Sequence, residues 1–346
     1  MIPQCAAPPV RLEAGISWNH PRARAIAWQL IVVAAFVAIA ASVAVQTAVN
    51  LRARGIASGF DFLSRPAGFE IARGLVSFSS SDTYARALVV GLVNTVRVSF
   101  LGIAIATPLG LLIGVARLSG IWIVSTVARV YVEMTRNTPL VLQLLFWYTL
   151  TQGLPAPANA LNPMPGVYLC FRGLFLPAPI WQHGFPWIGL EQPVLVGFGF
   201  QGGTSISPEF AALLVGLSTY TAAFIGETVR GGILAVGRGQ TEAAAALGLS
   251  RLHALRFVVL PQALRVIIPP TTSQFLNLFK NSSLAVAIGY PDLMSITNTT
   301  LNQTGQAIEA IALAMTVYLA GSVSLSAGMN AYNRTVASRG SSERQR

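Results

Sequence analysis

The sequence predicts an all-α membrane protein with six transmembrane helices. Only 10% of the 346 residues are charged and 53% are hydrophobic, whereas a soluble domain usually carries about 25% charged residues. The apolar residues also gather in stretches of about 20 residues or more, the length that crosses the roughly 30 Å hydrocarbon core of a bilayer as a helix. These two observations place the chain in the membrane class before any motif is considered.

Six stretches have this length, and the polar segments between them define the expected organisation. The first span, 25–49, follows a basic N-terminal segment, 1–24, and precedes a polar loop, 50–87. A cleaved signal peptide is the alternative for this stretch, but the apolar core of a signal peptide is usually only about 7–15 residues long. The other expected spans are 88–115, 126–151, 209–234, 258–288 and 307–329, with a long loop at 152–207 and a polar tail at 331–346.

Prolines predict breaks in two of these spans. Asn137-Thr138-Pro139 lies within 126–151, and Pro269-Pro270 lies within 258–288. A proline inside a helix removes one backbone hydrogen bond, and such breaks occur in membranes where protein or a cavity covers them. We therefore expect both spans to be interrupted at these residues.

The arginines indicate which side of the membrane each segment occupies. An even number of spans puts both termini on one side, and most of the arginines outside the spans fall on that side. Because basic residues accumulate on the cytoplasmic side, we expect both termini in the cytoplasm and the loops 50–87 and 152–207 in the periplasm. The net charge of +11 has the same explanation, so membrane lipid is an expected partner and nucleic acid is not.

Signatures of common enzymes and metal sites do not occur. The sequence contains neither a G-x-x-x-x-G-K-[ST] phosphate-binding loop nor a G-x-S-x-G nucleophile elbow. The three histidines lack metal-ligand spacing. The two cysteines, Cys5 and Cys170, fall on opposite sides of the membrane and could not pair. We expect no catalytic residue, no metal and no cofactor in this chain.

The most informative polar segment lies between the fourth and fifth predicted spans. Residues 239–248 read Gly-Gln-Thr-Glu-Ala-Ala-Ala-Ala-Leu-Gly. Thr241 is a suitable N-cap, which would put Glu242 at the positive end of the helix dipole, and the alanines favour a thin helix. Gly248 suits the turn after the last helical residue, and Ser250 can cap the next helix. The segment predicts a short helix projecting from the membrane; an amphipathic helix lying on the membrane surface is the alternative.

This segment resembles the EAA loop of ABC-transporter permease subunits, which docks onto a cytoplasmic ATPase. The resemblance rests on Glu242-Ala243-Ala244, on Gly248 and on Leu260-Pro261. Further segments are similar to the polar amino-acid permeases, the histidine, glutamine and arginine group. These segments are 136–140, with Asn137 in place of the common glycine, 227–232, 260–265 and 280–284. Together they cover most of 88–330, and the extra first span and the 152–207 loop are most like the general L-amino-acid permease subunits of Gram-negative bacteria.

The resemblance implies a fold, a function and a set of partners. The fold is a type-I ABC importer permease with its core at 88–330 and a cytoplasmic coupling helix. The function is that of a permease subunit in a binding-protein-dependent importer that moves polar L-amino acids across the bacterial inner membrane. The partners are a cytoplasmic ABC ATPase dimer that binds ATP, a second permease subunit, homologous or identical, and a periplasmic amino-acid-binding protein. The residues that would couple to the ATPase are Glu242, Ala243, Ala244, Gly248, Leu260 and Pro261.

Two other functions remain open at this stage. A secondary amino-acid transporter or channel would use the alanine-rich helix only as a surface helix. A membrane scaffold without transport is the other. Neither would need a partner ATPase.

Polar groups inside spans are costly in a bilayer, which makes them candidates for the transport path. Lys280, the only lysine, could meet a substrate carboxylate or reach the lipid headgroups. The asparagines and the serine near it could bind substrate or bridge neighbouring helices. Glu227 and Arg230 are three residues apart and are expected to form a structural ion pair. The path candidates are Thr138, Pro139, Asn277, Lys280, Asn281 and Ser282.

Overall fold

The computed structural model describes residues 21–53, 55, 58–71, 75–181 and 188–342, and the chain divides into two units, Met1–Ser58 and Gly59–Arg346. In the first unit, helix α1 (Pro21–Ala53) contains a stretch, Arg24–Ala53, that is long and apolar enough to cross a membrane. This helix includes the predicted first span, 25–49. Most of the predicted cytoplasmic segment 1–24, with Cys5, lies outside the described residues.

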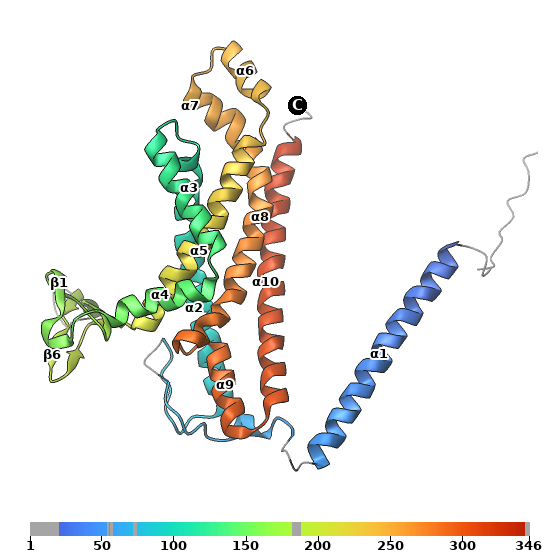
Figure 1. Cartoon of the computed structure of the whole chain (residues 1–346), viewed down its shortest axis with the longest axis vertical. Helices are drawn as coiled ribbons and strands as arrows, with labels where there is room; N and C mark the ends of the chain where they lie inside the picture. Colours follow the sequence, from blue (N-terminus) through green and yellow to red (C-terminus); the bar gives the residue numbers. More distant parts are fainter. Residues whose placement is uncertain (1–20, 54, 56–57, 72–74, 182–187, 343–346) are drawn as a thin grey trace, which may run out of the picture. The chain divides into compact units, whose positions relative to one another are not determined.

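The second unit is a bundle of long helices: α2 (Tyr84–Arg117), α5 (Pro208–Leu234), α8 (Leu260–Asn281) and α10 (Ala307–Ser342). Each belongs to a stretch that could cross a membrane, and with α1 they make five candidate spans among the described residues. Helix α5 packs against both α2 and α8, and α10 packs against α8 (Figure 1). The predicted second, fourth, fifth and sixth spans match these helices, although α10 continues through most of the predicted tail.

Small residues let α2 and α5 approach closely. A Cβ atom added at Gly110 would lie 2.6 Å from the Cβ of Ile225, and one at Gly114 would lie 2.6 Å from the Cβ of Val229. Real Cβ atoms do not come this near another carbon, so only glycine permits the observed separation. Close backbone approach through small residues is a common way for helices to associate in membranes. The buried core of the unit is built around this contact.

The predicted third span, 126–151, consists of two short helices. Helices α3 (Trp122–Asn137) and α4 (Leu140–Gln152) contain 16 and 13 residues. At 1.5 Å per residue they are about 24 and 20 Å long, so neither crosses a core of roughly 30 Å by itself. The predicted break at Thr138 and Pro139 is confirmed. The side-chain amide of Gln143 donates to the carbonyls of Thr135 at 2.8 Å and Thr138 at 3.0 Å, which replaces helical partners lost at the break.

The predicted interruption at Pro269-Pro270 is wrong. Both prolines lie inside the continuous helix α8. The hydroxyl groups of Thr271 and Thr272 donate to the carbonyls one turn earlier, at 2.8 and 3.0 Å. A membrane helix tolerates proline where neighbouring groups hold the surrounding turns, so proline alone does not determine where this span breaks.

The irregular turns of this span lie at its two ends. One π-helical turn, Leu255–Val259, precedes α8, and the N–H of Leu260 donates to the carbonyl of Leu255. Pro261 follows directly and has no N–H to continue the ordinary α-helical pattern. At the other end, the 3₁₀ turn Ser282–Ile288 stops at Gly289, whose φ of 77° favours glycine.

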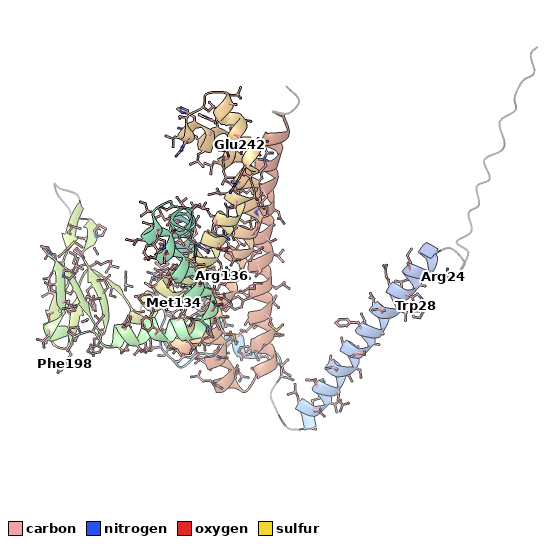
Figure 2. All side chains as sticks on the ribbon, turned by 45° about the horizontal axis from the view of Figure 1, so that its top comes forward. Arg24, Trp28, Met134, Arg136, Phe198 and Glu242 are labelled. Carbon is pink, nitrogen blue, oxygen red and sulfur yellow. The ribbon has the colours of Figure 1, made fainter. Side chains whose placement is uncertain are left out.

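The 152–207 loop contains short β-strands that the sequence did not predict, inserted into an otherwise helical membrane fold. Strands β1 (Leu161–Met164), β2 (Val167–Cys170), β3 (Gly173–Leu176) and β8 (Thr204–Ile206) form one antiparallel sheet in the order β1-β2-β3-β8. Two hairpins complete the insertion, β4 (Ala178–Trp181) with β5 (Ile188–Glu191) and β6 (Val194–Val196) with β7 (Gly199–Gln201). At the tip of the second hairpin, Phe198 is 89% exposed (Figure 2).

A short helix, α9 (Leu293–Thr304), was also not predicted. Its N-cap is the buried Asp292, whose carboxylate accepts the N–H of Ser295 at 2.8 Å and the hydroxyl of Tyr318 at 3.1 Å. The hydroxyl of Thr95 accepts the N–H of Leu293 at 3.0 Å. These polar contacts join α9 to α2 and α10, at the end of the bundle opposite α6 and α7 (Figure 1).

Candidate coupling surface and transport-path residues

The predicted coupling segment folds into two helices, α6 (Arg238–Ala246) and α7 (Arg251–Ala254), with a sharp turn between them. We call these helices with their connecting turn the elbow. Helix α6 begins at Arg238, so the prediction that Thr241 caps it is wrong. The residues before Thr241 are able to continue the helix, and the cap position falls on Gly237. Glu242 therefore lies in the middle of α6, with an exposed side chain, and not at its positive end (Figure 2).

The turn of the elbow confirms the expectation for Gly248. Its φ is 76°, in the left-handed region that favours glycine. The N–H of Gly248 donates to the carbonyl of Ala245 at 2.9 Å, and the N–H of Leu249 donates to the carbonyl of Ala244 at 3.1 Å. These two bonds form a Schellman motif. Ser250 caps α7 by accepting the N–H of His253 at 3.4 Å, as predicted.

Exposed apolar side chains mark the outer surface of the elbow. In the elbow itself Leu247 is 82% exposed and Leu252 is 72% exposed, and in the π-helical turn that follows it Phe257 is 62% exposed. Clustered exposed apolar residues commonly indicate a binding surface. The elbow is tied to the bundle by the side chain of Gln262, which donates to that of Gln240 at 3.3 Å.

The six predicted coupling residues do not share one face. Within the elbow Ala244 is buried, whereas Glu242, Ala243 and Gly248 are exposed. Leu260 and Pro261 are exposed on the first turn of α8, where the bundle begins. Their role in coupling stays a prediction.

A charged cluster lies near the same end of the bundle. Glu227 of α5 accepts from the Nη2 atom of Arg230 at 2.6 Å and from its Nε atom at 3.2 Å, which confirms the predicted pair. Arg117, the last residue of α2, also pairs with Glu227. The cluster thus links α2 to α5 beside the elbow. Arg117 could not be assigned from the sequence, since its position depends on how the two helices pack.

The predicted transport-path residues form two groups along the chain. Thr138 and Pro139 are exposed at the break between α3 and α4, where the Thr138 hydroxyl donates to the carbonyl of Met134 at 2.8 Å. The second group occupies the end of α8 and the turn after it: Asn277 and Lys280 are exposed, and Asn281 is half-buried. Asn277 lies three positions from Lys280 and four from Asn281, so it is a neighbour of both on the helix surface.

Ser282, the last of the second group, differs from its neighbours. It is buried, and its hydroxyl donates to the carbonyl of Phe279 in the preceding turn at 2.7 Å. The hydroxyl therefore completes its own helix. The role of Ser282 and of the other candidates in transport stays a prediction.

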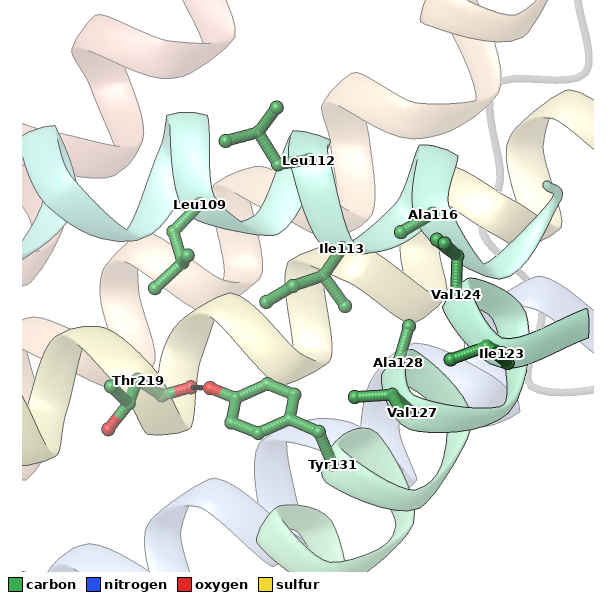
Figure 3. Close-up of a pocket in the computed structure, with 10 residues that line it drawn as sticks. All are labelled: Leu109, Leu112, Ile113, Ala116, Ile123, Val124, Val127, Ala128, Tyr131 and Thr219. Carbon is green, nitrogen blue, oxygen red and sulfur yellow. Dashed lines mark hydrogen bonds between the residues drawn. The ribbon is translucent and has the colours of Figure 1, made fainter. Parts of the chain in front are cut away.

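A large apolar groove lies between α2, α3 and α5, with a volume of about 680 Å³ (Figure 3). Only Tyr131 and Thr219 among its lining residues carry a polar side-chain group, and the Tyr131 hydroxyl already donates to the Thr219 carbonyl at 2.7 Å. With no charge in its wall, the groove suits lipid chains better than a polar substrate. Within the described residues, His, Cys, Asp and Glu do not gather in groups that could hold a metal ion.

Comparison of the sequence with known protein families identifies the family of the chain. Residues 106–338, which hold most of the bundle and the whole elbow, match the family of binding-protein-dependent transport system inner membrane components. The chain belongs to this family. The permease is thus an inner membrane component of an ABC importer, with the fold of a type-I importer permease, and its family is one of transport components and not of enzymes.

Two relatives are similar over nearly their whole length. The general L-amino acid transport system permease protein AapQ of Rhizobium johnstonii is 42% identical, over 93% of this chain and 96% of its own. The glutamate/glutamine/aspartate/asparagine transport system permease protein BztB of Rhodobacter capsulatus is 37% identical, over 91% of this chain and 94% of its own. Among solved structures, a crystal structure of an amino acid ABC transporter with histidines matches the permease with a TM-score of 0.53 and 26% identity, over 73% of this chain and 95% of that one.

Proposed function

We propose that the chain is the permease subunit of an importer for polar L-amino acids, with its elbow and both termini in the cytoplasm. The observation that carries the proposal is the elbow: a short helical segment with exposed apolar side chains, placed between the long helices α5 and α8 of a chain in the binding-protein-dependent family. The names of the two relatives support amino acids as the substrate class. The excess of arginine on the elbow side supports the orientation.

The elbow is suited to bind a partner and to transmit its movement to the membrane helices. Leu247, Leu252 and Phe257 present apolar groups that an ATPase cleft could bury, and buried apolar anchors carry most of the energy of protein interfaces. The Schellman turn fixes the angle between α6 and α7. A rigid-body movement of the docked elbow would pass to α8 through the continuous chain and to α2 and α5 beside it.

The other subunits of the proposed importer would supply the functions that this chain lacks. The sequence contains no phosphate-binding loop, so ATP would bind to a cytoplasmic ABC ATPase dimer. A periplasmic amino-acid-binding protein would deliver the substrate, and a second permease subunit, homologous or identical, would supply the other half of the path.

The test is the ATPase activity of the co-purified complex in lipid, with the binding protein loaded with each L-amino acid in turn. We expect stimulation by polar L-amino acids. Leu252→Glu should abolish co-purification of the ATPase, because it puts a charge into the proposed contact. Leu190→Glu, at a residue that is 68% exposed in the β insertion, is the matched control and should leave co-purification unchanged. If no ATPase accompanies the wild-type permease, a secondary transporter or channel becomes the better explanation.

A further inference from the structure

A small polar cavity lies between α2, the start of α5 and the segment after the fifth span. Its volume is about 180 Å³, which is below the roughly 300 Å³ of the smaller drug-binding pockets. Its wall is mostly polar, unlike that of the groove in Figure 3. The polar residues in this wall are Asn94, Arg97, Ser205, Ser207, Glu209 and Tyr290.

Arg97 brings a positive charge into this wall. Its guanidinium carbon lies 4.4 Å from the centre of the Phe210 ring. Among the described residues no carboxylate pairs with Arg97 within 4.0 Å. An arginine inside a candidate span is costly unless it faces a partner or a water-filled cavity. The cavity wall thus offers a cation whose charge is still available to a ligand.

Tyr290 adds an unused hydrogen-bond donor. The residue is only 4% exposed, and its hydroxyl has no hydrogen-bond partner in the part of the chain that the structure describes. Such orphaned polar groups are rare in folded proteins and call for an explanation. Burial raises the pKa of the Tyr290 phenol to about 12, so the hydroxyl keeps its proton at neutral pH and would bind an acceptor. Arg97 lies close enough to interact with this phenol electrostatically.

Glu209 supplies the opposite charge. It lies in the first turn of α5, two residues after Ser207, the N-cap of that helix. No cation pairs with it among the described residues. A lone anion such as a phosphate would be repelled by this carboxylate, whereas a ligand with both charges would find a partner for each.

Resting on the proposed function, we propose that this cavity receives the main-chain groups of an α-amino acid. Its carboxylate would bind Arg97 and the Tyr290 hydroxyl, and its ammonium group would bind Glu209. The small volume leaves the substrate side chain outside this wall. The cavity would therefore recognise what all α-amino acids share and would tolerate different side chains.

The first test is direct binding of radiolabelled L-glutamine to the purified complex in lipid, without the binding protein. Arg97→Gln should weaken binding about 10- to 100-fold, the usual loss for a charge-assisted hydrogen bond. Arg86→Gln is the matched control on the same helix, because Arg86 is exposed and pairs with Asp82 at 3.5 Å, away from the cavity. Wild-type affinity in Arg97→Gln would overturn the proposal.

Competing compounds separate recognition from a structural effect. The α-amide of glutamine, which lacks the carboxylate, should compete poorly with the wild type, and Arg97→Gln should remove most of this discrimination. Tyr290→Phe deletes one oxygen and Glu209→Gln keeps the shape, so these variants test the cavity even if Arg97→Gln does not assemble. They should lower affinity while the unfolding temperature stays within about 2 °C of the wild type, about what a change of 0.5–1 kcal/mol produces in a chain of this size. Equal competition by the amide and wild-type affinity in both variants would refute the site.

The outcome is distinguishable from failure of the proposed function. If the loaded binding protein stimulates the wild-type ATPase but the cavity variants bind and import normally, only the cavity proposal fails. If no amino acid stimulates or binds to the wild type, the importer proposal itself fails. Arg97 could instead bind a lipid phosphate. In that case the ligand held at Arg97 would be lost when the phospholipid phosphate is removed and would not respond to added amino acids. This result would assign Arg97 to a lipid headgroup and overturn the proposal.

Discussion

Replacing Gly248 by valine should uncouple the permease from its ATPase while leaving its insertion in the membrane intact. Gly248 has a φ of 76°, and a Cβ atom there would meet no other atom within 4 Å. The cost is thus backbone strain alone, about 1–3 kcal/mol for a non-glycine residue in the left-handed region. At about 2 kcal/mol, the turned elbow would lose roughly 30-fold in population against other conformations, because every 1.4 kcal/mol is a factor of ten.

The assay is amino-acid uptake by the reconstituted complex, together with the amount of ATPase that co-purifies. Gly239→Val is the matched control, since Gly239 lies in α6 without a positive φ and also has no atom within 4 Å of an added Cβ. Gly248→Asn should recover part of the activity, because asparagine tolerates the left-handed conformation best after glycine. Wild-type uptake in Gly248→Val, or an equal loss in Gly239→Val, would refute the role of the turn.

Three further predictions concern the bundle. Gly110→Leu should lower the unfolding temperature and the yield of the permease by separating α2 from α5, at a cost of at least about 1–3 kcal/mol. Gly120→Leu is the control and should leave both unchanged, because a Cβ added at Gly120 meets no atom within 4 Å. Glu227→Gln should destabilise the permease by about 1–3 kcal/mol in thermal unfolding, less than for a fully buried pair, because Arg117 and Arg230 lose their shared counter-charge. A change no larger than that of Glu70→Gln, at an exposed residue outside this cluster, would contradict this. Burial raises the pKa of Asp292 to about 6, so the folded state holds a proton that the unfolded chain releases, and stability should rise as the pH falls from about 6 to about 4. Asp292→Asn should remove this part of the pH dependence when unfolding temperatures at pH 5 and 7.5 are compared, and an unchanged difference would argue against it.

The predicted spans depended on composition and length, which act locally. A stretch of apolar residues must satisfy its backbone internally in a bilayer, so helices over 88–115, 209–234, 258–288 and 307–329 could be expected. The effect of proline was less predictable. At Pro139 the helix breaks and Gln143 replaces the lost partners, whereas Pro269 and Pro270 remain inside α8. Which of these happens depends on the neighbouring side chains and helices.

In the elbow too, some features could be predicted from the sequence and others could not. The positive φ of Gly248 and the cap by Ser250 follow from the chemistry of single residues, and both were predictable. The start of α6 was not, because a threonine that could cap a helix can also continue one, and three residues before Thr241 do so. Strands of three or four residues in the 152–207 insertion carry too little alternation to be recognised.

By itself the sequence determined the membrane class, most of the spans, the position and turn of the elbow, and the family, because each depends on local composition or on motifs contiguous in the chain. Only the tertiary structure decided that Arg117 joins Glu227, that Asp292 holds α9 against α10, and that Arg97, Glu209 and Tyr290 line one cavity. These residues are far apart in sequence, and packing between helices, such as α2 against α5 and α9 against α10, brings them together. The spacing of residues along the chain does not show how the helices pack, so the polar cavity could not be predicted without the fold.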